Sequence, residues 1–319
     1  MPTDSPLHLI VPFAQYNSDG WLTAVTALEL KNLGQLLRGM DLLQADFGRA
    51  DTLSTPHERA LAMAWGLKAS NNEGKEGTAD GLIPLAAVEA SAKPNEGWAF
   101  ITPCHWAMGR EHATLSDASA LEITEAQSRT LLAAMQPYFA TEGITLHFAA
   151  HNRWLAQGDV FRSLPTASLD RVLGRNVDAW LPKSKHMKLL QNEMQMLLYT
   201  HPINDERATL KQRSINSFWL SGSGALSEPF KAHPQVAIAP GLSPAALADD
   251  WVAYGQAWKR LDDTEIAQLL SQQKSNVPVR ISLCGESNAM TFQTAQQSIF
   301  SKFKGVLRRK RPIDVLKQL

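Results

Sequence analysis

The 319-residue chain has little cysteine, no net charge and no long apolar run. Its two cysteines, Cys104 and Cys284, lie far apart and form no CxxC pair, so neither a disulfide framework nor a cysteine zinc site is predicted. Lys and Arg total 31, as do Asp and Glu, which argues against a protein built mainly to coat nucleic acid or an anionic membrane. No apolar run approaches the roughly 18–20 residues that span a bilayer.

Metal-binding patterns are also missing from the sequence. No HxH, HExxH or DxD spacing occurs, and none of the nine histidines follows His233. Because a metal needs converging histidines and carboxylates, the sequence predicts neither a metal nor a cofactor. The first residues, MPTDSPLHLIVPF, carry an acid where a secretory signal has basic residues. These absences together predict a soluble, cytoplasmic protein with no membrane partner.

The chain does contain ample material for a folded core. Hydrophobic residues make up 44% of it and nine tryptophans are present, which excludes a disordered protein. Six strands are predicted, at His8–Ala14, Trp98–Pro103, Ile144–Ala150, Ile215–Leu220, Gln235–Ala239 and Val277–Leu283. Helices are predicted at Leu28–Leu43, from Pro56 after the capping box of Thr55, from Thr124 to Phe139, at Ser184–Tyr199, from Ser243 to Lys259 and from Asn288 to Leu307.

The alternation of strands and helices predicts the fold class. It is typical of an α/β protein in which helices flank a mostly parallel sheet. At about 150 residues per domain, the length indicates two domains or one core with an insertion. The polar stretch Ser70–Gly81 and the irregular stretch Ser163–Ser184 interrupt the pattern. We therefore predict a discontinuous core of residues 1–81 and 160–319, with an inserted subdomain of residues 82–159.

A serine-containing turn follows the last predicted strand. Gly285-Glu286-Ser287 stands between that strand and a helical pattern, as in the elbow that presents a nucleophilic serine. That arrangement requires a histidine after the serine, and the sequence has none after His233. We therefore reject the elbow and expect a strand-to-helix turn with a capping side chain.

Two stretches have the residue types of an anion site. In His201-Pro202-Ile203-Asn204-Asp205-Glu206-Arg207, the histidine, asparagine and arginine offer neutral donors and a bidentate clamp, although helix ends have the same composition. The stretch Ser221-Gly222-Ser223-Gly224 offers close backbone approach to a phosphate or carboxylate, although a plain turn at a strand end would look the same.

Two further features allow a functional and a structural interpretation. Cys104 and His105 form a Cys/His pair, but neighbours on a strand point to opposite faces, which favours a buried cysteine and a hydrogen-bonded histidine. Ile299–Leu319 holds seven Lys or Arg and one Asp, a local charge of +6. This basic tail, with Arg308–Arg311 at its centre, is a candidate contact for nucleic acid or an acidic partner, and alternatively a solvated amphipathic tail.

Several blocks together resemble a known family. DGLIPLAAVEA, WAFITPCHW, EMQMLLYTHPINDER and INSFWLSGSG are similar to the archaeal-type cofactor-independent phosphoglycerate mutases of the alkaline phosphatase superfamily. TLSTPHERALAMAWGL, TPCHW and LQNEMQMLLYTHP more closely resemble a proteobacterial group named as regulatory proteins of the RpfE type. The resemblance implies an alkaline-phosphatase-like core of mostly parallel sheet, with residues 82–159 as an inserted α+β lid.

The sequence departs from the mutases where their chemistry resides. Pro12-Phe13-Ala14 stands at the end of the first strand where the family has an Asp-Gly metal site, and Glu29-Leu30-Lys31 replaces the stretch of the nucleophile. The family's late histidine ligands have no counterpart after His233, and Ser221 replaces its arginine in the glycine turn. Without these groups a transferring phosphoryl group has no Lewis acid.

The resemblance therefore implies a degenerate member that keeps a ligand pocket. The expected lining comprises His201, Asn204, Arg207, Asn216, Gly222 and Gly224, with His57, Arg59 and His105 from matching blocks. We expect a regulatory protein that binds a small phosphorylated or carboxylate ligand. The alternatives are an active mutase or phosphatase with relocated catalytic groups, and an adaptor that binds nucleic acid or protein through the basic tail.

Overall fold

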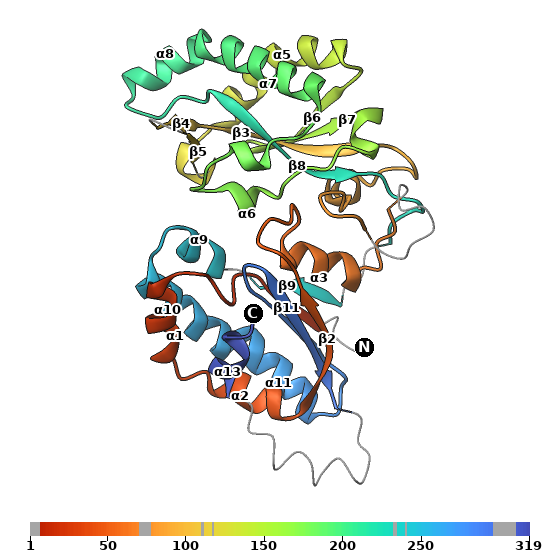
Figure 1. Cartoon of the computed structure of the whole chain (residues 1–319), viewed down its shortest axis with the longest axis vertical. Helices are drawn as coiled ribbons and strands as arrows, with labels where there is room; N and C mark the ends of the chain where they lie inside the picture. The colour runs from red at the N-terminus through yellow and green to blue at the C-terminus, as the bar shows by residue number, and fades with distance from the viewer. Residues whose placement is uncertain are drawn as a thin grey trace. The chain divides into compact units, whose positions relative to one another are not determined.

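The chain folds into two compact units, each with its own sheet (Figure 1). The computed structural model describes residues 7–69, 78–109, 112–116, 118–231, 235–239, 241–295 and 311–319. Unit 1 comprises Met1–Asp51, Thr55–Trp65 and Ala232–Leu319, and unit 2 comprises Thr52–Ser54 and Gly66–Lys231. Residues 66–81 and 160–231, which we expected in the core domain, cluster with unit 2.

Unit 1 is built on a mixed five-stranded sheet. Its strands lie in the order β2 (Met40–Phe47), β11 (Asn288–Thr294), β10 (Arg280–Cys284), β1 (His8–Val11) and β9 (Val236–Ile238). Strand β1 runs parallel to both of its neighbours, β10 and β9, whereas β11 runs antiparallel to β10 and to β2. The expectation of a mostly parallel sheet is therefore wrong for this unit, because a hairpin adds β11 beside β10.

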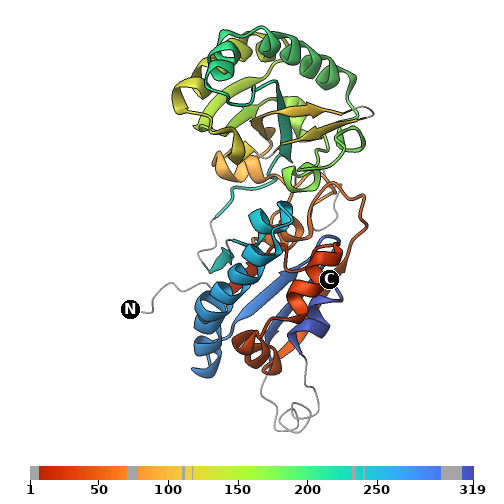
Figure 2. The ribbon, with the colours of Figure 1, turned by 90° about the vertical axis from the view of Figure 1, so that its left-hand side faces the viewer.

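The two faces of this sheet pack against different helices. Leu9, Val11, Ile281 and Leu283 face the main core of the unit. The helices on this face are α1 (Asp19–Thr26), α2 (Lys31–Arg38), α9 (Leu242–Leu247), α10 (Trp251–Leu261), α11 (Ala267–Lys274) and α13 (Pro312–Leu316), several of which lie in front of the sheet in Figure 2. The opposite face packs against α3 (Pro56–Ala64), which contacts β1, β10 and β11.

A buried carboxylate joins two of these helices. A single π-type turn, Asp262–Ile266, connects α10 to α11 and turns Asp262 toward the start of α2. The two carboxylate oxygens of Asp262 accept from the backbone N–H groups of Leu33 at 2.8 Å and Asn32 at 3.0 Å. Since Leu30 offers α2 no capping side chain, Asp262 satisfies the first N–H groups of that helix from 230 residues away.

Unit 2 has a four-stranded antiparallel sheet. Its strands lie in the order β6 (Thr145–Ala150), β7 (Arg153–Gln157), β3 (Trp98–Cys104) and β8 (Ser217–Gly224). Along the chain, α5 (Glu125–Thr141) joins β3 to β6, while α7 (Lys185–Tyr199) and α8 (Pro202–Thr209) lead from β7 to β8. This is the β-α-β-β-α-β arrangement of ferredoxin-like domains, which has no parallel strand pairs.

Smaller elements complete unit 2. Figure 1 shows α5, α7 and α8 together on one side of the sheet, where Leu131, Met135, Met194 and Leu198 form part of a second core. Short elements are β4 (Trp106–Met108), β5 (Ala113–Leu115), α4 (Leu85–Glu89) and α6 (Leu169–Val172), with single 3-10 turns at Ala118–Leu121, Asp159–Arg162 and Asp178–Trp180. Within the described ranges of the chain, no helix is both long and apolar enough to cross a membrane.

The local helix signals are confirmed, and two predicted helices are wrong in part. Thr55 and Thr124 both form complete capping boxes, and Ser184 caps α7. The predicted helix Leu28–Leu43 contains α2 but then turns at Gly39 into β2, which continues the apolar sequence as a strand. The predicted helix from Asn288 begins instead as β11, in which Met290 and Phe292 alternate into the core. Its residues 296–307 lie outside the described part of the chain.

Candidate functional site

The nine residues predicted for one pocket are divided between the two units. His57 and Arg59 belong to unit 1. The other seven, His105, His201, Asn204, Arg207, Asn216, Gly222 and Gly224, belong to unit 2. Neither unit therefore contains the whole predicted lining.

The two asparagines of unit 2 join backbone segments. Asn204 Nδ2 donates to the carbonyl oxygens of Leu198 at 2.7 Å and Ile215 at 2.9 Å, and Asn204 Oδ1 accepts from the N–H of Ile215 at 2.8 Å. Asn216 Oδ1 accepts from the N–H of Trp106 at 2.7 Å, and its Nδ2 donates to the carbonyl of Trp106 at 3.0 Å. Both amides thus hold the segment that enters β8.

The fully buried side chain of Arg207 connects α8 to the start of α5 through hydrogen bonds. Its Nε donates to the carbonyl oxygen of Arg213 at 2.8 Å, its Nη1 to Gln127 Oε1 at 2.9 Å and its Nη2 to the carbonyl of Leu121. The side chain has no exposed surface, and its burial lowers the pKa of the guanidinium. All three nitrogens of the guanidinium are therefore engaged within the protein.

The two histidines of unit 2 also make local contacts. His201 begins α8, and its Nδ1 accepts from the N–H of Ile203 at 3.2 Å. His105 Nδ1 lies 2.9 Å from the carbonyl oxygen of Ser214. Its neighbour Cys104 is buried, and this burial raises the pKa of the thiol. The structural interpretation of this Cys/His pair is thereby confirmed.

The glycines lie at the opposite end of β8 from Asn216. The eight residues of β8 separate Asn216 from Gly224 by about 26 Å at 3.3 Å per residue, so the two cannot line one small pocket. The expected glycine turn is instead a bulge within the strand: Gly222 has φ +60°, and a Cβ there would lie 2.6 Å from the ring of Phe100. Ser223 is fully buried and donates to the carbonyl of Gly81.

In unit 1, three loops meet where the parallel strands end. The neighbours of β1 on its two sides, β9 and β10, follow each other along the chain, so the order of strands reverses at β1. Ligands of open α/β sheets bind outside the carboxyl ends of the strands at such a switch point. We call three segments the carboxyl edge: residues 12–17 after β1, residues 284–288 from the end of β10 to the start of β11, and residues 55–59 at the start of α3.

Phe13 at the carboxyl edge has a strained backbone. Its φ of +55° lies in the left-handed region, which a residue with a Cβ rarely adopts. The Tyr254 hydroxyl donates to the carbonyl of Phe13 at 2.7 Å, and the N–H of Ala14 donates to the carbonyl of Cys284 at 2.8 Å. Strain of this kind persists only where surrounding contacts impose it, and it is concentrated at functional sites.

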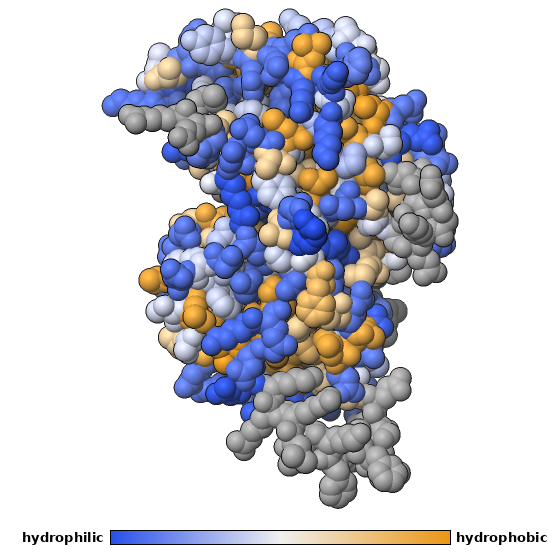
Figure 3. Space-filling model, viewed as in Figure 1, coloured by the Kyte–Doolittle hydropathy of each residue, from blue (hydrophilic) through white to orange (hydrophobic). Residues whose placement is uncertain are grey.

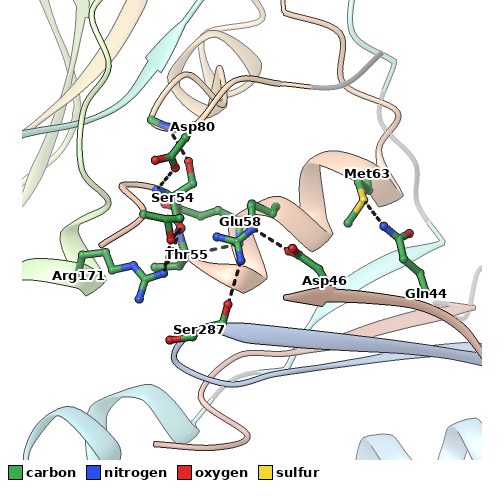
Figure 4. Close-up of polar contacts among 12 residues, drawn as sticks. Gln44, Asp46, Ser54, Thr55, Glu58, Met63, Asp80, Arg171 and Ser287 are labelled. Carbon is green, nitrogen blue, oxygen red and sulfur yellow. Dashed lines mark hydrogen bonds and ion pairs between the residues drawn. The ribbon is translucent and has the colours of Figure 1, made fainter. Parts of the chain in front are cut away.

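His57 and Arg59 approach this strained segment from α3. The ring centroid of His57 lies 5.8 Å from that of Phe13, and His57 Nε2 lies 3.1 Å from Thr55 Oγ1. Arg59 Nε donates to Asp46 Oδ2 at 2.7 Å, and its Nη2 donates to the carbonyl of Ser287 at 3.1 Å. Figure 4 shows Asp46 on β2 and Ser287 in the turn between β10 and β11.

The capping box limits what the start of α3 can bind. Glu58 accepts from the N–H of Thr55 at 2.9 Å, and Thr55 Oγ1 accepts from the N–H of Glu58 (Figure 4). The Glu58 carboxylate already compensates the positive end of the helix dipole. An anion at the carboxyl edge would therefore depend on the side chains of His57 and Arg59 more than on the helix terminus.

The turn that contains Ser287 joins two antiparallel strands. The N–H of Gly285 donates to the carbonyl of Asn288 at 2.8 Å and closes the β10–β11 hairpin. The expected strand-to-helix turn is therefore wrong, although the rejection of the nucleophile elbow stands. Glu286 Oε2 accepts from the N–H of Asn17 at 3.1 Å, which joins this hairpin to the loop after β1.

Sequence reasoning missed Phe13, Tyr16, Trp251 and Glu286 at this edge. Tyr16 stacks on Phe13 with ring centroids 6.1 Å apart, and the ring centroids of Trp251 and Tyr16 are 6.0 Å apart. Their only signal in the sequence is that Phe13 and Tyr16 follow a predicted strand and that Glu286 belongs to the turn already singled out. Nothing in the sequence brings Trp251 to them.

The metal site that the family resemblance implies does not fit the residues present. Pro12, Phe13 and Ala14 follow β1 and offer no metal-binding side chain. No cluster of three or more His, Cys, Asp or Glu that could hold an ion occurs among the residues for which the structure gives positions. We therefore derive no step through a metal.

The basic tail falls mostly outside the described residues. Of Arg308–Arg311, the structure describes Arg311, which precedes α13 and pairs with Asp314 at 2.9 Å. Val315 and Leu316 of α13 are buried in the core of unit 1. The expected contact with nucleic acid or an acidic partner stays a prediction.

Comparison with known proteins gives distant structural similarity. No family model and no curated protein matches the sequence. The cofactor-independent phosphoglycerate mutase from Thermoplasma acidophilum DSM 1728 is 12% identical over 98% of this chain and 99% of that chain, with a TM-score of 0.34. The PH0037 protein from Pyrococcus horikoshii is 10% identical over 91% of this chain and 88% of that chain, with a TM-score of 0.42. These similarities are weak, and no residue is assigned a role from them.

Proposed function

We propose that the protein binds a small phosphorylated or carboxylate ligand at the carboxyl edge of unit 1 and acts as a regulatory binding protein. The observation that carries this proposal is the contact of His57 with Phe13, whose backbone is strained just after β1. Strain at a switch point, beside a side chain that can carry positive charge, is a reason to expect a ligand there.

The polar groups at this edge suit an anion better than those of unit 2. His57 and Arg59 are both partly exposed and come from one turn of α3. Arg59 is held in place by Asp46 and by the Ser287 carbonyl, so its guanidinium is oriented before a ligand arrives. In unit 2, by contrast, the contacts of Asn204, Arg207 and Asn216 account for these residues without a ligand.

A binding role is favoured over catalysis because the edge lacks an assembled nucleophile. Cys284 ends β10 beside the hairpin, but it has no exposed surface and burial raises the pKa of its thiol. Ser287 contributes its backbone carbonyl to Arg59 and to the N–H of Gly48. An enzyme with relocated catalytic groups is the alternative that the experiment must separate from this proposal.

A thermal-shift and calorimetric titration tests the proposal. The probes are 2-phosphoglycerate, 3-phosphoglycerate, inorganic phosphate and citrate, each added to wild type, His57→Ala and the control His151→Ala, whose histidine is exposed in unit 2. At 100 times Kd, a bound probe stabilises the folded protein by about 2.7 kcal/mol. We expect that stabilisation in wild type and in His151→Ala, and its loss in His57→Ala.

Three results would overturn the proposal: two of them concern binding and the third concerns catalysis. If none of the probes stabilised the wild-type protein, the proposed ligand site would be wrong. It would also be wrong if a probe stabilised His57→Ala as much as wild type. Interconversion of the two phosphoglycerates, or release of phosphate from them, by the purified protein would replace binding with catalysis. Tightly bound transition metal ions in the purified protein would support catalysis.

A further inference from the structure

Strand β2 forms one end of the unit 1 sheet and is long for an edge strand. It pairs with β11 on one side, and on its other side no strand occurs among the residues that the structure describes. Its eight residues span about 26 Å, whereas strands average five or six residues. Figure 1 shows β2 at the outer margin of the sheet. An open edge of this length presents a row of backbone N–H and C=O groups to a further strand.

Large apolar side chains accompany this open edge. Leu42 is 49% exposed, Leu43 45% and Phe47 71%. Met63 of α3 is 45% exposed, and its Sδ lies 3.0 Å from Gln44 Nε2, as Figure 4 shows. Figure 3 shows apolar surface, in orange, where β2 crosses unit 1. Isolated apolar residues are common on surfaces, but several along one open strand mark an interaction site.

The strand has few of the features that protect edges from pairing. Its sequence, MDLLQADF, contains no lysine, arginine or proline. A bulge at Leu42–Gln44 twists its first half, which explains why the consecutive residues Leu42 and Leu43 are both exposed. The regular half, through Ala45 to Phe47, keeps a continuous register with β11.

The charge of β2 selects the kind of partner. Asp41 is exposed, whereas the carboxylate of Asp46 is half-buried and pairs with Arg59 at 2.7 Å. Full-length antiparallel pairing of two copies of β2 would set Asp41 of one copy opposite Asp46 of the other, so Asp41 would face a carboxylate and no basic side chain of the other strand. An added strand with a basic residue opposite Asp41 gains a favourable charge pair at that position.

We infer that β2 binds an extended segment of a partner protein, in which basic residues alternate with apolar ones, by adding it as a sixth strand. The backbone groups of β2 supply the hydrogen bonds, and Leu43, Phe47 and Met63 supply apolar contacts. This inference shares one residue with the ligand proposed at the carboxyl edge, namely Asp46 of β2, which orients Arg59 and stays unchanged in the variants tested below.

Fluorescence anisotropy with a labelled octapeptide of alternating Lys and Val tests the inference on the full chain. We expect saturable binding of this peptide, and binding at least about tenfold weaker for the matched Glu/Val peptide and for Phe47→Lys and Leu43→Lys. The control Val252→Lys changes a residue that is 74% exposed on α10 and should bind as wild type does. A Lys/Val peptide methylated on alternate backbone nitrogens should not bind, because it lacks the donors.

Three results would overturn the inference. If the Lys/Val and Glu/Val peptides bound equally well, β2 would have no preference for a basic partner strand. Unchanged binding of the N-methylated peptide would exclude strand addition, even if the lysine variants failed to fold. A dimer in sedimentation velocity that Phe47→Lys dissociates would make a second copy of this chain the occupant of β2.

Discussion

The hydroxyl of Tyr254 holds the carbonyl of Phe13 at 2.7 Å, and the same hydroxyl accepts from Trp21 Nε1 at 3.1 Å. Tyr254 on α10 thereby joins α1 to the strained segment that follows β1. Both partner groups are buried, so neither has water as a substitute. This contact explains how Phe13 is kept in the left-handed backbone conformation at the carboxyl edge.

Replacement of Tyr254 by Phe should therefore destabilise the protein. The substitution leaves the carbonyl of Phe13 and the indole N–H of Trp21 unsatisfied, at a cost of about 1–3 kcal/mol. Urea unfolding measures the change, and Tyr138→Phe, at a residue that is 40% exposed on α5, is the control. A variant as stable as wild type would show that this hydroxyl does not maintain the segment.

Replacement of Arg207 by Ala should destabilise unit 2 strongly. It removes the three donors that hold Arg213, Gln127 and Leu121, and loss of one partner of a buried charged network costs about 3–5 kcal/mol. Denaturant unfolding followed by tryptophan fluorescence measures the loss. Arg213→Ala, at an exposed side chain, should stay within about 0.5 kcal/mol of wild type. Unchanged stability with lost binding of phosphate probes would instead restore Arg207 as a ligand residue.

Replacement of Asp262 by Ala should weaken the start of α2. The backbone N–H groups of Asn32 and Leu33 lose their acceptor, and loss of a capping side chain costs about 0.5–2 kcal/mol. Hydrogen exchange of these two amides should accelerate together with the loss of stability. The neighbouring exposed residue gives the control, because Asp263→Ala should leave both amides protected.

The stability of unit 1 should decrease as the pH is lowered, because of His8. Burial, and secondarily the charge of Arg280, lowers the pKa of His8 from 6.5 to about 4 in the folded protein. Between these values the unfolded chain binds the proton and the folded chain does not, so stability rises with pH across this window and is lost as pH falls from 6.5 toward 4. The shift corresponds to about 3 kcal/mol at most.

Urea unfolding at pH 7.5 and pH 4.5 measures this effect. His8→Gln keeps a donor for Ser282 Oγ, which lies 2.8 Å from His8 Nε2, and removes the titration. The difference between the two pH values should therefore shrink in His8→Gln and persist in His147→Gln, whose histidine is exposed. If the difference in stability between the two pH values were equal in all three proteins, groups other than His8 would cause the loss of stability in acid.

Signals that depend on a few neighbouring residues could be interpreted from the sequence. The capping boxes of Thr55 and Thr124 specify the starts of their helices, because each depends on a pair of residues three positions apart. The strands around Leu9, Ile101 and Ile281 are recognisable because each is a short, buried, apolar run. These elements form the centres of both sheets.

Features that depend on distant partners could not be predicted. Leu36, Leu37, Leu42 and Leu43 suit a helix as well as a strand, and only the pairing of β2 with β11 decides where the helix ends. Arg207 has the sequence context of a helix end, but its partners Gln127 and Leu121 lie about 80 residues earlier in the chain. The carboxyl edge was missed for the same reason, since Phe13 meets His57, Tyr254 and Cys284 only through the fold.

The interrupted path of unit 1 has a consequence for biosynthesis. His8 pairs with Val236 and with Arg280, whereas the sheet of unit 2 is contained within one continuous stretch, Gly66–Lys231. During translation, unit 2 has all of its strands before the ribosome makes the first partner of β1. The N-terminal strand must then wait, unpaired and apolar, while more than two hundred residues are added. Unit 1 can therefore complete its sheet only after the whole of unit 2 has been synthesised.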